Sequence, residues 1–200
     1  MDSDVIIIGG GLVGGTLALA LALHEVTSIV VDAQDLDTTI LPVFDGRASA
    51  IASASGRMLR ALGLGDILDQ HGCPIREIRV TDATHPQFLH FDAGEENDPL
   101  GTMLENRLLR IALLRAVREC PEVTLIAPVT VAGIDRDDHA ATLRLADGRV
   151  FRAPLVVACD GRRSATREAA GIPVSQWHYP HAALITMVAH TVPHHNIACE

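Results

Sequence analysis

The chain has 200 residues, 48% of them hydrophobic, which is enough to bury a sizeable core in one ordinary domain or in part of a larger one. It contains no lysine, which excludes a lysine Schiff base, a lysine nucleophile and a phosphate-loop lysine. A formal net charge of -9 argues against nucleic acid as a partner, and four cysteines without a Cys-x-x-Cys pair are typical of a reducing cytoplasm.

The first element in chain order lies within residues 5–23, which carry no charged side chain and have the length of a membrane span. However, this segment holds five glycines in its first eleven residues and follows Asp2 and Asp4 rather than a basic stretch. We therefore expect a strand followed by a helix, and neither a membrane span nor a signal peptide.

Residues 5–8 form a short β-branched run, typical of a strand buried in a parallel sheet. A G-x-G-x-x-G pattern made by Gly9, Gly11 and Gly14 follows directly, and residues 16–23 predict a buried helix. The first glycine permits a tight turn, the second lets a diphosphate approach, and the third brings helix and strand together. Main-chain amides at the helix start, including those of Leu12 and Val13, would point at the diphosphate.

A second predicted strand, residues 29–31, ends at Asp32, whose carboxylate can accept hydrogen bonds from ribose hydroxyls. Strand, glycines, helix and acid together predict dinucleotide binding but leave NAD and FAD both open. The acid followed by Ala33 and Gln34 argues against NADP in this site. The alternative is a glycine-rich turn between two core elements.

Three later segments carry a family resemblance. Residues 45–51 are expected to open a helix that Gly63 ends; residues 105–113 begin with Glu105 and Asn106; and residues 159–167 follow a predicted strand at 155–158. With the glycine pattern, these segments resemble the flavin-dependent aromatic hydroxylases. The resemblance is greatest to the branch that hydroxylates the polyprenylated phenol ring in ubiquinone biosynthesis.

The resemblance implies FAD in the dinucleotide site, with Arg47 reaching its phosphate or ribose and Asn106 lying near it. It also links Asp160 and Gly161 to FAD and to the reductant, NADH or NADPH, which makes Arg162, Arg163 and Arg167 candidates for contact with the reductant. Simpler roles stay open for each of these residues. Arg47 would be a surface arginine at a helix start, residues 102–105 a capping box before Asn106, and Asp160-Gly161 a turn before a helix capped by Ser164.

The predicted fold is α/β, a Rossmann-like FAD-binding domain with a β-meander plus part of an inserted β-rich substrate domain. Strands at 129–134, 140–145 and 149–152, with a turn at Asp147-Gly148, predict the meander. The FAD-binding domain is expected to comprise residues 1–75 and 100–171. Residues 76–99 and 172–200 are expected to belong to the substrate domain, with strands at 78–80 and 182–189 and loops at His85-Pro86, Glu95-Glu96 and Asp98-Pro99.

The resemblance implies a monooxygenase that hydroxylates a small-molecule phenolic substrate with O2 and NADH or NADPH. It would act in the cytoplasm, peripheral to the inner membrane, within a membrane-associated biosynthetic complex. The family's second flavin motif has no counterpart before Glu200, so a truncated chain is expected. The alternatives are a related oxidoreductase without oxygen insertion, such as a prenyl reductase, and a non-catalytic nucleotide-binding fragment.

No catalytic triad or carboxylate pair is apparent in the sequence, and the flavin chemistry of the family needs none. A metal site is not expected either. His190, His194 and His195 have helical spacing, but Pro193 would break a helix at that point.

Overall fold

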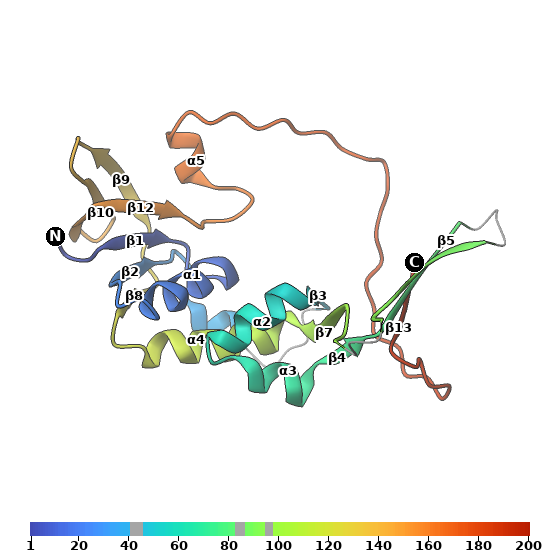
Figure 1. Ribbon diagram of the computed structural model, residues 1–200. Coiled ribbons are helices and arrows are strands. Elements are labelled where there is room, and N and C mark those ends of the chain that lie inside the picture. Colours follow the sequence, from blue (N-terminus) through green and yellow to red (C-terminus); the bar gives the residue numbers. More distant parts are fainter. Residues whose placement is uncertain (41–45, 83–86, 95–97) are drawn as a thin grey trace. The chain divides into compact units, whose positions relative to one another are not determined.

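The computed structural model describes residues 1–40, 46–82, 87–94 and 98–200 (Figure 1). It divides into two compact units: residues 1–42 with 110–182, and residues 43–109 with 183–200. The predicted loops at His85-Pro86 and Glu95-Glu96, and Asp45 at the start of the 45–51 segment, lie outside the described residues. The unit borders differ from the predicted domain borders, and the assignment of residues to FAD and substrate domains stays a prediction.

A four-stranded parallel sheet forms the centre of the first unit. Its order is β12 (Leu155–Ala158), β1 (Val5–Ile8), β2 (Ser28–Val31) and β8 (Val123–Ile126), as Figure 1 shows from top to bottom. Every residue of β1 and β2 is buried, because the sheet is covered on both faces. This arrangement confirms the three strands predicted at 5–8, 29–31 and 155–158.

The two faces of β1 contact different partners. Ile7 lies against α1 (Leu12–Ala22), the helix that follows the glycine turn. Ile6 and Ile8 join a core cluster with Leu143 and Leu145 of the meander. Because side chains alternate along a strand, one β-branched run fills both layers and needs no polar face.

The meander consists of β9 (Val131–Arg136), β10 (Ala141–Leu145) and β11 (Val150–Ala153), paired antiparallel with β10 in the centre. Gly148 has φ +91° in the turn between β10 and β11, a conformation that glycine adopts without steric cost. The predicted meander is thus confirmed. The remaining elements of the first unit are the 3-10 helix η1 (Leu36–Ile40), the part of α4 (Asn106–Glu119) from residue 110 onward, and α5 (Ala165–Ala169).

The apolar segment 5–23 becomes β1, the glycine turn and α1, as predicted from its glycines. Within the described ranges, no helix has both the length and the apolar character needed to cross a bilayer.

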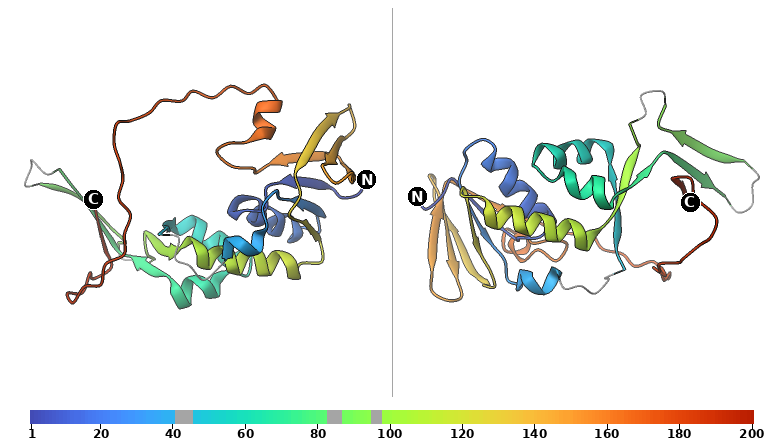
Figure 2. Two further views of the ribbon diagram at one scale, coloured as in Figure 1. Left: turned by 180° about the vertical axis from the view of Figure 1, so that it is seen from behind. Right: turned by 90° about the horizontal axis from the view of Figure 1, so that it is seen from below.

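Two small sheets and two helices make up most of the second unit. Strands β3 (Ala48–Ala52), β7 (Gly101–Glu105) and β4 (Cys73–Ile75) form one antiparallel sheet, on which α2 (Ser53–Ala61) and α3 (Gly65–His71) pack. The other sheet contains β13 (Ile197–Cys199), β5 (Glu77–Thr81) and β6 (Phe88–Asp92). Figure 2 shows the green hairpin of β5 and β6 from two sides.

Three predictions of local structure are wrong. Residues 48–52 form β3 rather than the start of a helix, because they pair with β7 along its whole length; α2 begins only at Ser53. Residues 102–105 lie in β7 and therefore do not form a capping box before α4. Residues 182–189 are not a strand, since no pairing with them occurs in the described chain, and Leu184 is 97% exposed.

Candidate dinucleotide-binding site

The carboxyl ends of β1, β2 and β12 meet at one edge of the parallel sheet. The Gly9 amide donates to the Val31 carbonyl oxygen at 2.7 Å, and the Cys159 amide donates to the Ile8 carbonyl oxygen at 2.6 Å. These bonds bring the residues that follow the three strands, Gly9, Asp32 and Asp160, to the same edge. Ligands of open α/β sheets bind at such an edge.

Two of the three pattern glycines are required by close backbone contacts. Gly9 has φ +104°, and a Cβ there would lie 2.6 Å from the carbonyl carbon of Cys159. A Cβ at Gly14 would overlap the carbonyl oxygen of Gly9 and stand 3.2 Å from Ile7 Cγ2. Gly11 differs, because a Cβ there would meet nothing within 4 Å. The protein therefore needs Gly9 and Gly14 for its own packing, whereas Gly11 faces open space.

Helix α1 starts at this open space. Its N-cap is Gly11, no side chain caps it, and its first turn contains no acidic residue. The amides of the first turn, which include those of Leu12 and Val13, and the positive end of the helix dipole are thus not compensated by a capping side chain. This arrangement is suited to an anion such as a diphosphate.

The carboxylate of Asp32 is held in place by the main chain. Oδ2 accepts from the Gly10 amide at 2.6 Å, and Oδ1 accepts from the Gln34 amide at 2.7 Å. The Asp32 backbone is fixed as well, since its carbonyl oxygen accepts from the Val129 amide at 2.8 Å. A carboxylate with such fixed geometry retains lone pairs for the hydroxyl groups of a ribose.

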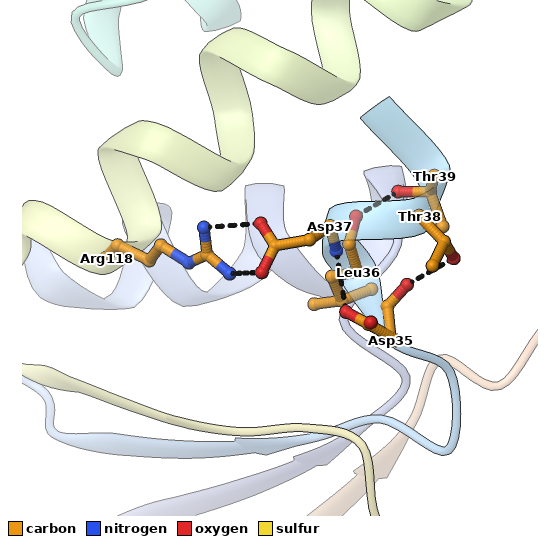
Figure 3. A network of polar contacts seen from close by, with 6 residues as sticks. All are labelled: Asp35, Leu36, Asp37, Thr38, Thr39 and Arg118. Carbon is orange, nitrogen blue, oxygen red and sulfur yellow. Dashed lines mark hydrogen bonds and ion pairs between the residues drawn. The ribbon is translucent and has the colours of Figure 1, made fainter. Parts of the chain in front are cut away.

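The segment after Asp32 is fastened to α4 by a bidentate ion pair (Figure 3). Arg118 Nη1 and Nη2 donate to the two oxygens of Asp37 at 2.8 and 2.9 Å, and this hydrogen bonding lowers the pKa of Asp37. The Asp35 side chain accepts from the Asp37 amide at 3.0 Å. Between the two acids, Leu36 is buried, and its Cδ1 lies 3.1 Å from the position of a Cβ on Gly10. The ion pair thus holds in place the segment whose Leu36 packs against the glycine turn.

Asp160 lies in a short loop closed by α5. Burial raises the pKa of Asp160, but hydrogen bonds from Ser164 and from Thr166 outweigh it, so that the pKa lies below its ordinary value. Ser164 caps α5 by accepting from the Arg167 amide at 2.9 Å, as predicted, and Gly161 has φ +83°. Oδ1 of Asp160 is buried and has no hydrogen-bond partner among the described residues. Such an acceptor is available for a donor group of a ligand.

Two cavities open beside these groups in the first unit, and Asp32 lines both. One, of about 490 Å³, also has Asp160, Arg163 and residues 129–134 in its wall. The other, of about 340 Å³, contacts residues 10–13 of the glycine turn, Leu36 and Arg110.

Residues 129–130, which the sequence pattern assigns only to the meander, and Arg110 are site residues that sequence reasoning missed. The position of Arg110 four residues after Asn106 on a predicted helix was the available signal for the latter.

Arg47 and Asn106 belong to the second unit, where the structure brings them together. The main-chain amide of Asn106 donates to the Arg47 carbonyl oxygen at 3.0 Å. Ser49 Oγ donates to Oδ1 of the Asn106 side chain at 2.6 Å. These two hydrogen bonds join the first residue of α4 to the residue before β3 and to Ser49 within β3. Their roles toward a cofactor stay predictions.

Three histidines near the C-terminus, His190, His194 and His195, are of a residue type that binds metal ions. The rings of His190 and His194 meet edge to face with centroids 5.7 Å apart. In the part of the chain that the structure describes, no group of three or more His, Cys, Asp or Glu side chains could hold a metal ion.

A parallel sheet with a glycine turn, an uncapped helix start and an acid after the second strand defines a dinucleotide-binding domain of the Rossmann type. Residues 2–198 match the FAD binding domain family, and the chain belongs to this family. The match confirms the predicted fold class and the choice of FAD over NAD.

Curated proteins that are similar to this chain include ubiquinone hydroxylases. The chain is 44% identical over 198 residues to ubiquinone hydroxylase UbiL of Rhodospirillum rubrum, covering 99% of this chain and 46% of the relative. It is 36% identical over 189 residues to 3-demethoxyubiquinol 3-hydroxylase of Escherichia coli, covering 93% of this chain and 48% of the relative. The chain thus spans about half the length of these relatives.

A solved structure agrees with the fold. PqsL of Pseudomonas aeruginosa, described as a probable FAD-dependent monooxygenase, superposes with a TM-score of 0.73 at 26% identity. The superposition covers 89% of this chain and 48% of that protein.

The residues present fit the adenosine diphosphate part of FAD. Gly11 leaves room for a diphosphate at the start of α1, and Asp32 is fixed where a ribose can be bound. At the same sheet edge, Oδ1 of Asp160 is buried and has no hydrogen-bond partner among the described residues. These three observations are independent of the family match.

Proposed function

We propose that this chain forms the FAD-binding part of a monooxygenase that hydroxylates the phenolic ring of a polyprenylated ubiquinone precursor with O2 and NADH or NADPH. The observation that carries the proposal is the 44% identity over 198 residues to a ubiquinone hydroxylase. The glycine turn and its acid support it, because they account for the cofactor that such a reaction needs.

Each predicted site residue has a role in this proposal. The amides of Leu12 and Val13 at the start of α1 bind the diphosphate, with Gly9, Gly11 and Gly14 shaping the turn, and Asp32 binds the ribose. Asp160 and Gly161, which follow β12 at the same sheet edge, also contact FAD. Arg47 and Asn106, which the family resemblance links to the cofactor, are the other two residues that we propose to contact FAD.

When bound, FAD supplies the oxygen-insertion chemistry, taking electrons from the nicotinamide and passing them to O2. The chain's own tasks are to bind the cofactor, orient it and keep water from it, since water favours loss of the oxidant as peroxide. No catalytic acid or base from this chain is assigned.

The remaining parts of the proposal concern domains and partners. Residues 1–75 and 100–171 form the FAD-binding domain, and residues 76–99 and 172–200 contribute to a substrate domain. A prenyl tail makes the substrate lipophilic, which accounts for an enzyme at the membrane surface or within a membrane-associated biosynthetic complex.

The first test is the visible absorption spectrum of the purified 200-residue chain with added FAD, before and after gel filtration. The proposal predicts that the chain elutes with both flavin bands and with a spectral shift relative to free FAD. Elution of a folded, colourless chain at saturating FAD would mean that this part alone is a half-site. A chain extended through the second flavin motif that also elutes colourless would contradict the cofactor assignment.

A second test addresses the reaction. The chain, extended to the length of the ubiquinone hydroxylases that it matches and loaded with FAD, is supplied with NADH or NADPH, O2 and a prenylated phenol, and products are analysed by mass spectrometry. A product that has gained one oxygen atom supports the monooxygenase. Nicotinamide oxidation that never yields such a product would assign the chain to the related oxidoreductases without oxygen insertion.

A further inference from the structure

We infer that Arg110 is a further cofactor-binding residue, which pairs with the diphosphate of the bound dinucleotide. The inference rests on the proposed function, because it assumes that the glycine turn binds FAD. It adds a side-chain cation, besides the Arg47 that the family resemblance implies, to a site that the glycine pattern describes through main-chain amides and an acid.

The packing of α4 in the first unit places Arg110 at the glycine turn. Leu113 and Val117 are buried, and Leu113 Cδ2 lies 2.9 Å from the position of a Cβ on Gly15 of α1. Arg110 precedes Leu113 by three residues and Leu114 by four, so it lies on the same face of α4. This face forms one side of the cavity of about 340 Å³ whose other side is the turn at residues 10–13.

The charges around this cavity show why an anionic ligand needs a cation there. Among the described residues that line it, Asp32 and Arg110 are the charged ones. A diphosphate carries two negative charges, whereas the start of α1 contributes the equivalent of about half a positive charge. Asp32 adds a further negative charge at the rim. Without Arg110, an anionic ligand would meet a locally unfavourable field.

The guanidinium group is chemically suited to this role. It stays charged at any physiological pH and presents parallel N–H groups that match two phosphate oxygens. Arg110 is half-buried and lines the cavity, and a side chain of this length can pack its aliphatic part along the helix.

A competition experiment tests the assignment on the 200-residue chain. ADP and adenosine, which differ by the diphosphate alone, displace FAD from the wild type and from Arg110→Gln, Arg110→Lys and Arg115→Gln. Arg115 is the matched control, because it lies on the same helix, is exposed and pairs with Glu119. Melting temperatures establish that each variant is folded.

We expect Arg110→Gln to weaken ADP and FAD binding by about 10- to 100-fold and adenosine binding by less than about threefold. Arg110→Lys should lie between Arg110→Gln and the wild type, and decides the matter if Arg110→Gln does not fold. The Arg115→Gln control should bind all three as the wild type does.

Two results would overturn the inference while leaving FAD binding intact. One is unchanged ADP affinity in Arg110→Gln. The other is an equal loss for ADP and adenosine, which would mean that Arg110 supports Asp32 or the local fold instead of contacting phosphate. A wild-type chain that binds neither FAD nor ADP would refute the proposed function, and the inference with it.

Discussion

Replacement of Gly14 by alanine separates the glycines that the fold requires from the one that leaves room for a ligand. In the structure, a Cβ at Gly14 would overlap the Gly9 carbonyl oxygen, stand 3.0 Å from the Gly9 carbonyl carbon and 3.2 Å from Ile7 Cγ2. Because two of these atoms belong to the backbone, rotation of a side chain cannot relieve the overlap. Helix α1 and the turn must move apart.

The expected cost follows from two opposing effects. Overpacking against backbone lies near the upper end of its usual range, about 3 kcal/mol. Alanine in place of glycine inside a helix increases the free energy of unfolding by about 1 kcal/mol. The net loss in the free energy of unfolding is about 2 kcal/mol, which lowers the melting temperature by about 4–8 °C for a chain of this size.

Gly11→Ala is the matched variant, because a Cβ at Gly11 meets nothing within 4 Å. Alanine is less favourable than glycine at an N-cap by about 0.5–1 kcal/mol, so the melting temperature should fall by about 2 °C. FAD affinity should fall by at least about tenfold, since the Cβ occupies space that a diphosphate needs. Thermal denaturation followed by circular dichroism and FAD fluorescence titration measure both quantities. The reasoning is refuted if Gly14→Ala melts as high as Gly11→Ala, or if Gly11→Ala binds FAD as tightly as the wild type.

Two further predictions concern the segment after β2. Asp32→Asn should weaken FAD binding by about tenfold, because the variant loses the charged acceptor for the ribose, whereas Asp35→Asn should stay within about twofold in the same titration. Equal losses in both variants would show that the effect is merely one of surface charge. Arg118 lowers the pKa of Asp37, so the stabilisation by this pair should be present above the ordinary pKa of an aspartate and be lost as pH falls through the lowered value in the folded state. A double-mutant cycle of Asp37→Asn and Arg118→Gln, followed by thermal melts, should show coupling at pH 7 that disappears in acid; coupling that persists when Asp37 is protonated would contradict the assignment.

The sequence alone was sufficient for the unit from β1 to β2, where every determinant is local. β-branched residues favour the strand, and the spacing of Gly9 and Gly14 matches the turn in which each is needed. Asp147-Gly148 likewise predicted a hairpin in the meander, and Ser164 predicted the cap of α5. The family resemblance also came from motifs of contiguous residues, and the match over residues 2–198 confirms it.

Predictions failed where a partner distant in sequence decides the local structure. Residues 48–52 have apolar positions compatible with a helix, yet pairing with β7, more than forty residues away, makes them a strand. Strand β6 was missed because its exposed side chains show no pattern, and it forms through its hydrogen bonds to β5. Conversely, residues 182–189 have the composition of a strand but no neighbour to pair with among the described residues.

The candidate site shows the same division. The glycine turn and Asp32 could be read from the sequence, because strand, turn and helix follow one another along the chain. Asp160 could also be placed from the sequence at the carboxyl end of a parallel strand. Only the tertiary structure placed residues 129–130 beside it, joined η1 to α4 through Arg118, and brought Arg110 to the wall of the cavity. Main-chain hydrogen bonds between parallel strands and the packing of α4 against α1 determine those positions, and such contacts depend on folding the whole unit rather than on any short run of residues.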